Sequence, residues 1–107
     1  MILEIGVLKV RPELEAEFLK NVAEGVALFR RAKGCRGMEV RSSPEAPGEY
    51  RLLVLWETLD NHLVDFRNSP DLLEWRRLTV HCYAEPPDIK NWAVAVDGFG
   101  FAAGGVV

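Results

Sequence analysis

Two segments of the 107-residue chain, residues 2–10 and 49–57, are rich in Ile, Leu and Val and carry apolar side chains at odd and even positions alike. Successive side chains of a β-strand point to opposite faces of its sheet, so both faces of these predicted strands are apolar. In the first segment Leu3, Ile5 and Val7 lie on one face and Ile2, Leu8 and Val10 on the other. In the second segment one face carries Leu53 and Leu55, and the other carries Tyr50, Leu52, Val54 and Trp56. An antiparallel sheet with one wet face would instead alternate apolar and polar residues. Each face of the predicted sheet therefore needs its own apolar cover.

The residues between these segments predict a helix and a β-hairpin. Pro12 suits the first position of a helix, and apolar residues three and four apart continue for about twenty residues up to Gly34. They are Leu14, Phe18, Val22, Val26 and Phe29. The segments CRGMEVRSS and EYRLLVLWE then flank PEAPG, whose Pro and Gly residues predict the loop of a hairpin.

After Trp56 the spacing of the apolar residues becomes helical again. The segment TLDNHLVDF predicts a short helix capped by Thr58, and the segment SPDLLEWRRLTV predicts a second helix capped by Ser69. Two consecutive prolines end helical structure, and residues 89–96 form the last predicted strand.

The resulting order, βαββαβ, is typical of a ferredoxin-like α+β fold with a four-stranded antiparallel sheet and helices on one face. Because 107 residues hold no spare element, the other face is predicted to pack on the same face of a second copy, giving a homodimer through sheet-to-sheet packing. Residues 1–97 form the predicted domain, and residues 98–107 form an apolar, glycine-rich tail. Disorder of this tail and packing of its Phe99 and Phe101 on the partner both stay open.

Charge and cysteine pattern exclude several classes of function. A formal net charge of -3 with dispersed Lys and Arg residues provides no basic surface for nucleic acid. The first ten residues include acidic and basic side chains and are too short to cross a membrane, so a cytoplasmic protein is predicted. Cys35 and Cys82 lie outside any C-x-x-C pattern, and His62 and His81 outside any H-x-x-x-H pattern, so no metal site is predicted.

The run WETLDNHLVDFRNSPDLLEWR after the hairpin, with AEPPDIKNW leading into the last strand, resembles the antibiotic biosynthesis monooxygenase (ABM-type) domains of the dimeric α+β barrel superfamily. The resemblance covers residues 2 to about 96. It implies a dimer in which each subunit holds a pocket between its sheet and its helices. Some members oxidise electron-rich polycyclic aromatics or quinols without metal or flavin, while others degrade haem, isomerise small signalling molecules or have no known activity.

The resemblance points to His62, which occupies a place where ABM-type sequences often carry a histidine. His62 is the candidate base or hydrogen-bond partner of a substrate. Phe66 lies four residues later on the same helix face, and Trp75 and Arg76 follow in the next helix, so an aromatic wall and a cation could converge there. Trp56 is a further candidate for the pocket wall. Each residue also has a purely structural interpretation. His62 could be a partly buried histidine whose hydrogen bonds are satisfied within the protein, Trp56 and Trp75 could serve only to fill an apolar core or interface, and Arg76 could point to solvent.

The leading hypothesis is a cofactor-independent monooxygenase acting on a small hydroxylated aromatic or quinol, with no metal. The alternative is a non-catalytic small-molecule-binding or regulatory module on the same fold. Haem degradation fits less well, because Gly6, Phe66 and either Trp75 or Arg76 stand near the places where haem-degrading members carry an Asn, a Trp and the axial His. RNA-recognition domains share the βαββαβ order, but they need exposed aromatic and basic strand residues, where RLLVLWE offers leucines.

Overall fold

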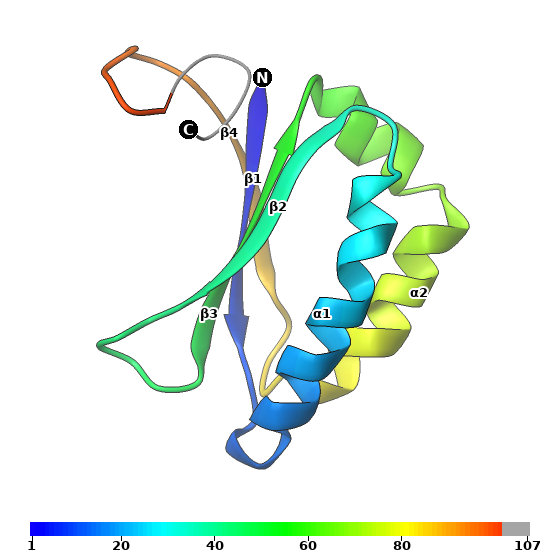
Figure 1. The fold of residues 1–107 in the computed structure, drawn as a ribbon, viewed down its shortest axis with the longest axis vertical. Helices are drawn as coiled ribbons and strands as arrows, with labels where there is room; N and C mark the ends of the chain where they lie inside the picture. The colour runs from blue at the N-terminus through cyan, green and yellow to red at the C-terminus, as the bar shows by residue number, and fades with distance from the viewer. Residues whose placement is uncertain (102–107) are drawn as a thin grey trace.

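The computed structural model describes residues 1–101 and contains the predicted elements in the predicted order (Figure 1). The strands are β1 (Ile2–Lys9), β2 (Cys35–Ser42), β3 (Glu49–Trp56) and β4 (Asp88–Ala93), and the helices are α1 (Glu15–Arg30) and α2 (Pro70–Thr79). Three short helical turns join them: η1 (Pro12–Leu14), η2 (Asn61–Phe66) and η3 (Val80–Cys82). The predicted βαββαβ order and the hairpin between β2 and β3 are confirmed.

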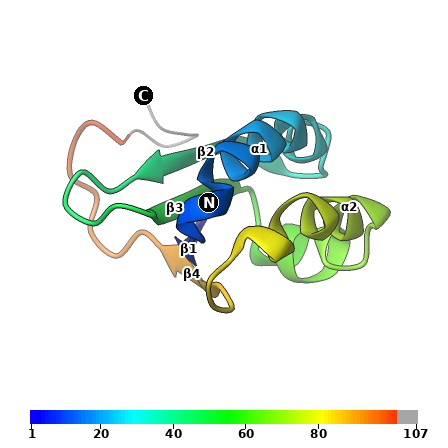
Figure 2. The ribbon, with the colours of Figure 1, turned by 90° about the horizontal axis from the view of Figure 1, so that it is seen from below.

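The four strands form one antiparallel sheet in the order β2-β3-β1-β4. Figure 2 shows α1 and α2 side by side on one face of this sheet. The predicted ferredoxin-like α+β architecture is therefore confirmed. The helices of residues 1–101 are all too short or too polar to span a lipid bilayer.

The core lies between the sheet and the two helices. Its strand residues stand at even positions and include Leu8, Tyr50, Leu52, Val54 and Trp56. From α1 it takes the buried Phe18, Val22, Leu28 and Phe29, whereas Leu14 and Val26 of the predicted stripe are only partly buried. The stripe is shifted because α1 packs on α2 as well as on the sheet. Gly25 faces α2 so closely that a Cβ atom there would lie 2.7 Å from the Trp75 ring.

The face of the sheet turned away from the helices is also apolar, as predicted. It carries Leu3, Ile5, Val7, Leu53 and Leu55, which are all partly exposed, and we call these five residues the outer apolar face. Trp92 on β4 pairs with Leu3 and continues this surface with 53% of its area exposed. No helix of residues 1–101 covers the outer apolar face.

The helix caps follow the predictions, but two element boundaries and one helix type differ. The Thr58 hydroxyl accepts a hydrogen bond from the Asn61 backbone N–H (3.1 Å), and the Asn61 side chain accepts one from the Thr58 N–H (3.0 Å). Ser69 caps α2 by accepting from the Leu72 N–H. The first predicted helix is split into the turn η1 and the sixteen-residue α1, and β4 ends at Ala93 rather than at residue 96.

The short helix after Thr58 is a π-helix, η2, rather than an α-helix. The Arg67 N–H reaches back five residues to the His62 carbonyl (3.2 Å), the pairing that defines this wider turn. Isolated π-helical turns recur at functional sites, where the widened turn re-aims side chains. Here the turn carries His62 and Phe66.

Candidate functional site

A cavity of about 330 Å³ lies between the sheet and the segment η2–α2. Its walls are mainly apolar and include Leu8 and Leu52 from the strands and Phe66 and Trp75 from the helical side. Phe29 also lines the cavity. Its ring centroid lies 5.0 Å from that of Phe66 and 4.8 Å from that of Trp75, which it meets edge-on. The volume is at the lower end of the range for pockets that hold a small organic ligand, roughly 300–1,000 Å³.

Four polar side chains form a connected group at one end of this cavity. Glu4 on β1 stands directly opposite Asn91 on β4, and both point to the helix side. His62 bridges them, with its Nδ1 atom 2.7 Å from Asn91 Oδ1 and its Nε2 atom 3.3 Å from Glu4 Oε1. The Trp56 indole N–H donates to the same Glu4 oxygen at 2.9 Å.

The Trp56 ring also fixes the plane of the imidazole. The two rings are stacked with 5.6 Å between their centroids and 1° between their planes. Together with the bond to Asn91, this stacking leaves His62 little freedom to rotate. The His62 side chain keeps 15% of its area exposed, so a molecule in the cavity can touch it.

The hydrogen-bond partners determine where protons can sit in this group. Asn91 Oδ1 can only accept, so His62 Nδ1 carries a hydrogen, and Nε2 is left to share a proton with Glu4. Burial raises the pKa of Glu4, which is 3% exposed, and the charge of His62 and the Trp56 hydrogen bond oppose this rise. The 3.3 Å between His62 Nε2 and Glu4 Oε1 leaves room for one hydrogen between the two atoms.

The structure brings four of the five predicted site residues to one cavity. His62, Phe66, Trp75 and Arg76 all line it, and Arg76 belongs to its exposed edge. Trp56 is fully buried and lies behind His62, outside the described cavity wall. Its contact with the site runs through Glu4 and the His62 ring, so direct contact of Trp56 with a ligand stays a prediction.

Glu4 and Asn91 were missed as site residues. Glu4 did leave a signal in the sequence, since it is a carboxylate at a helix-facing position of an otherwise apolar strand, and such groups are rarely buried without a partner. Asn91 left none, because it meets His62 only through the register of β4 against β1.

With this geometry in place, comparison with known proteins identifies the family. The model of the antibiotic biosynthesis monooxygenase family matches residues 1–78, which is most of the chain. The chain belongs to the antibiotic biosynthesis monooxygenase family. The matched region holds Glu4, His62 and the aromatic wall, and it ends before β4 and Asn91.

Individual proteins and solved structures are similar to the chain over most of its length. A crystal structure from Bordetella bronchiseptica that carries the same family name is 47% identical, covers 89% of this chain and 97% of its own, and has a TM-score of 0.84. The uncharacterised protein YczJ of Bacillus subtilis is 29% identical over 86% of this chain and 97% of its own length. SnoaB of Streptomyces nogalater, a cofactor-independent oxygenase, shares the fold with a TM-score of 0.77 at 14% identity, over 90% of this chain and 94% of its own.

Proposed function

We propose that this chain is a cofactor-independent monooxygenase that acts on a small hydroxylated aromatic or quinol. The observation that carries the proposal is the Glu4–His62 pair, held in place by Trp56 and Asn91, at the end of a cavity with aromatic walls. A group that accepts one proton beside an apolar space suits an aromatic substrate that must lose a phenolic proton before it reacts.

The cavity walls suit a flat ring. Phe66 and Trp75 offer aromatic surfaces that Phe29 holds in place, so a ring can pack on them without reordering the core. Arg67 and Arg76 lie at the exposed edge of the cavity, where a guanidinium group would favour an anionic or hydroxyl substituent. The substrate would enter with its hydroxyl group toward His62.

The proposed reaction balances with dioxygen as the co-substrate. With Glu4 ionised and His62 neutral, the pair takes the phenolic proton, and the resulting anion supplies electrons to dioxygen. One oxygen atom bonds to a ring carbon that loses its hydrogen. The other leaves as water with that hydrogen and the phenolic proton. A phenol and O₂ thus give a quinone and water, four electrons pass from substrate to oxygen, and no outside reductant is consumed.

SnoaB adds support from a relative of the same fold, because it is a cofactor-independent oxygenase. At 14% identity this likeness concerns the fold, so the chemistry proposed for the present chain depends on its own residues.

We also propose that the protein is a homodimer joined through the outer apolar face. Burying Leu3, Ile5, Val7, Leu53 and Leu55 against the same residues of a second copy would give the apolar cover that the sheet needs. Phe99 and Phe101, which are 96% and 77% exposed, follow β4 and would be covered at the edge of the same interface. Obligate interfaces of this kind bury more than about 2,000 Å².

Oxygen uptake with a panel of phenols and quinols tests the enzymatic proposal. The purified protein, treated with a chelator and free of flavin, should consume oxygen with at least one substrate and place one atom of ¹⁸O₂ in the product. His62→Ala and Glu4→Gln should each lower the rate by about 10²–10⁴-fold, the usual contribution of a general base. Glu13→Gln, an exposed carboxylate on η1, is the matched control and should keep the wild-type rate.

Two results would reject catalysis in favour of other functions. Binding of the aromatic ligands in the cavity without oxygen uptake would identify the non-catalytic binding module. Oxygen uptake that is equal in wild type, His62→Ala and Glu4→Gln would remove the proton-transfer role of the pair.

A further inference from the structure

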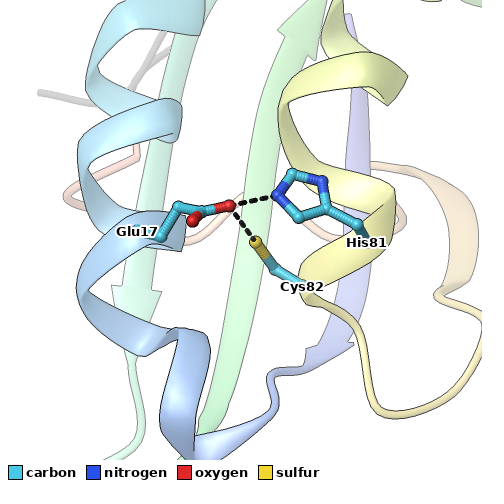
Figure 3. A group of neighbouring side chains, drawn as sticks. All are labelled: Glu17, His81 and Cys82. Carbon is cyan, nitrogen blue, oxygen red and sulfur yellow. Dashed lines mark hydrogen bonds and ion pairs between the residues drawn. The ribbon is translucent and has the colours of Figure 1, made fainter.

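A second group of reactive side chains lies outside the cavity, between α1 and η3. Glu17 lies in the first turn of α1, and His81 and Cys82 are consecutive residues of η3. Figure 3 shows the three side chains pointing toward one another from the two elements. Their candidate ligand atoms all lie within 4.8 Å of one another. None of the three lines the cavity of the proposed oxygenase site.

The contacts converge on a single oxygen atom. Glu17 Oε2 is in contact with His81 Nε2 and lies 4.0 Å from the Cys82 sulfur atom. In a tetrahedral zinc site the ligand atoms lie about 2.0–2.3 Å from the metal, which places them about 3.4 Å from one another. The Glu17–His81 contact must therefore open, and the Glu17–Cys82 contact must close by about half an ångström. The His81–Cys82 separation, which is at most 4.8 Å, must reach the same spacing.

The exposure of Glu17 and His81 makes this adjustment cheap. Glu17 and His81 each have 48% of their side-chain area exposed, so they can turn toward a metal ion without disturbing the core. Cys82 is fully buried and packed in the core, so its sulfur would act as the fixed ligand to which the other two adjust.

We propose that Glu17, His81 and Cys82 bind a zinc ion. A thiolate, an imidazole and a carboxylate form a mixed sulfur, nitrogen and oxygen donor set that suits zinc, whereas Mg²⁺ and Ca²⁺ prefer oxygen ligands. The two anionic ligands balance the charge of the metal. Three protein ligands leave a fourth position for water, and the bound ion would tie α1 to η3.

This site is independent of the oxygenase reaction, and sequence patterns do not reveal it. Glu17 and His81 are separated by 64 positions, and they meet only because α1 and η3 pack side by side. An ion pair on the surface would need only Glu17 and His81. The sulfur of Cys82 beside the same oxygen atom is what distinguishes a metal site from such a pair.

Titration of the full chain with Co²⁺ and Cd²⁺ tests the proposal. The protein is used without a polyhistidine tag, reduced, and stripped of metal with a chelator. We expect a thiolate-to-metal absorption band that saturates at one ion per chain and is removed by added Zn²⁺ as it displaces Co²⁺. Zinc should also raise the melting temperature, because it binds the folded chain.

Variants assign the site to these residues. His81→Ala and Glu17→Gln should each weaken zinc binding at least tenfold, and Cys82→Ser should abolish the thiolate band. Cys35→Ser removes the other cysteine and should keep both the band and the affinity, as should Glu24→Gln, an exposed carboxylate on the same helix α1. If Cys82→Ser fails to fold, the zinc affinities of His81→Ala and Glu17→Gln test the site without it.

Three results would overturn the proposal: no thiolate band in the wild type, a band that is lost in Cys35→Ser, or an affinity unchanged in both His81→Ala and Glu17→Gln. Each can be read without any substrate, so failure of the zinc site and failure of the oxygenase are separate outcomes.

Discussion

At the scale of single residues, Glu4 is the side chain on which the proposed site most depends. A carboxylate buried among apolar strand residues is costly unless it is paired, and here the Trp56 N–H and His62 Nε2 face it. The indole bond and the imidazole each favour the ionised form, while burial favours the neutral form and has the largest effect on the pKa of Glu4. Glu4 is thus held where a single proton can be gained or lost.

This balance predicts how Glu4 affects stability as the pH changes. Its pKa is raised above the ordinary value of 4.5, so above pH 4.5 the unfolded chain binds fewer protons at this group than the folded chain does. The contribution of Glu4 to the free energy of unfolding therefore falls as the pH rises from 4.5 through the folded-state pKa. Glu4→Gln has no such titration and should gain stability relative to the wild type over the same range.

Urea unfolding of the wild type and Glu4→Gln at a series of pH values measures this difference. Glu13→Gln again controls for the loss of one carboxylate. A difference between wild type and Glu4→Gln that stays constant, or that moves in favour of the wild type with rising pH, would contradict the burial of an ionisable pair at this position.

The sequence predicted four residues that line the cavity but did not predict Glu4 or Asn91. His62 and Phe66 could be placed on one face because they lie four residues apart, and Trp75 and Arg76 follow in the next helix. That spacing is local, and the structure keeps these four side chains at one cavity. Asn91 could not be found in this way, since only the pairing of β4 with β1 brings it to His62.

At the scale of elements, the contact between α1 and α2 sets the back wall of the cavity. Gly25 on α1 meets the Trp75 ring on α2, and Trp75 also packs edge-on against Phe29. Trp75 is therefore held between α1 and the cavity. Any side chain at position 25 would push this ring toward the space that the substrate needs.

Gly25→Ala should lower the free energy of unfolding although alanine is the better helix former. The gain in helix propensity is about 1 kcal/mol, whereas overpacking of a core usually costs about 1–3 kcal/mol. Because the added Cβ atom would stand 2.7 Å from a buried ring, we expect the cost to be at the upper end of this range and the net loss of stability to reach about 2 kcal/mol. Thermal or urea unfolding measures the change.

Ala27→Gly, at an exposed position of the same helix, is the control for helix propensity alone and should lower the free energy of unfolding by about 1 kcal/mol. Gly25→Ala protein that is as stable as the wild type would show that Trp75 can move away. The packing that we assign to this wall of the cavity would then be wrong.

The type of the helix after β3 is a further property of elements that local spacing did not predict. At its start the Thr58 hydroxyl accepts from the Asn61 N–H and the Asn61 side chain accepts from the Thr58 N–H, a pattern that α-helices also show. In its π-helical turns His62 and Phe66 face the cavity and Asn61 is buried. Residue types alone do not distinguish these turns from an α-helix.

At the scale of the whole molecule, the outer apolar face is the feature that calls for a second copy. Leu53 and Leu55 on β3 lie beside Ile5 and Leu3 on β1, and charged residues are confined to the ends and edges of this surface. Water at such a surface is unfavourable by about 25 cal/mol for each square ångström of apolar area. A symmetric sheet-to-sheet dimer would remove most of that cost.

Sedimentation of the wild type should therefore give a dimer, and Leu53→Lys should shift the equilibrium toward monomer by at least tenfold. Each dimer would place two new ammonium groups in its apolar interface, and an unpaired buried charge is strongly unfavourable. Leu73→Lys makes the same exchange on α2, where Leu73 is 66% exposed, and should remain a dimer. A wild type that sediments as a monomer would refute the proposed interface.

The sequence alone determined the order of the elements, the two apolar faces of the sheet, the helix caps and the family, because all of these follow from patterns within short stretches of chain. The grouping of Glu4, His62 and Asn91 through hydrogen bonds, and the meeting of Glu17 with His81 and Cys82, arise from how the elements pack. Such meetings depend on strand register and on how each helix is rotated against its neighbour. Those quantities are set by packing between residues far apart in the chain, and no local pattern carries them.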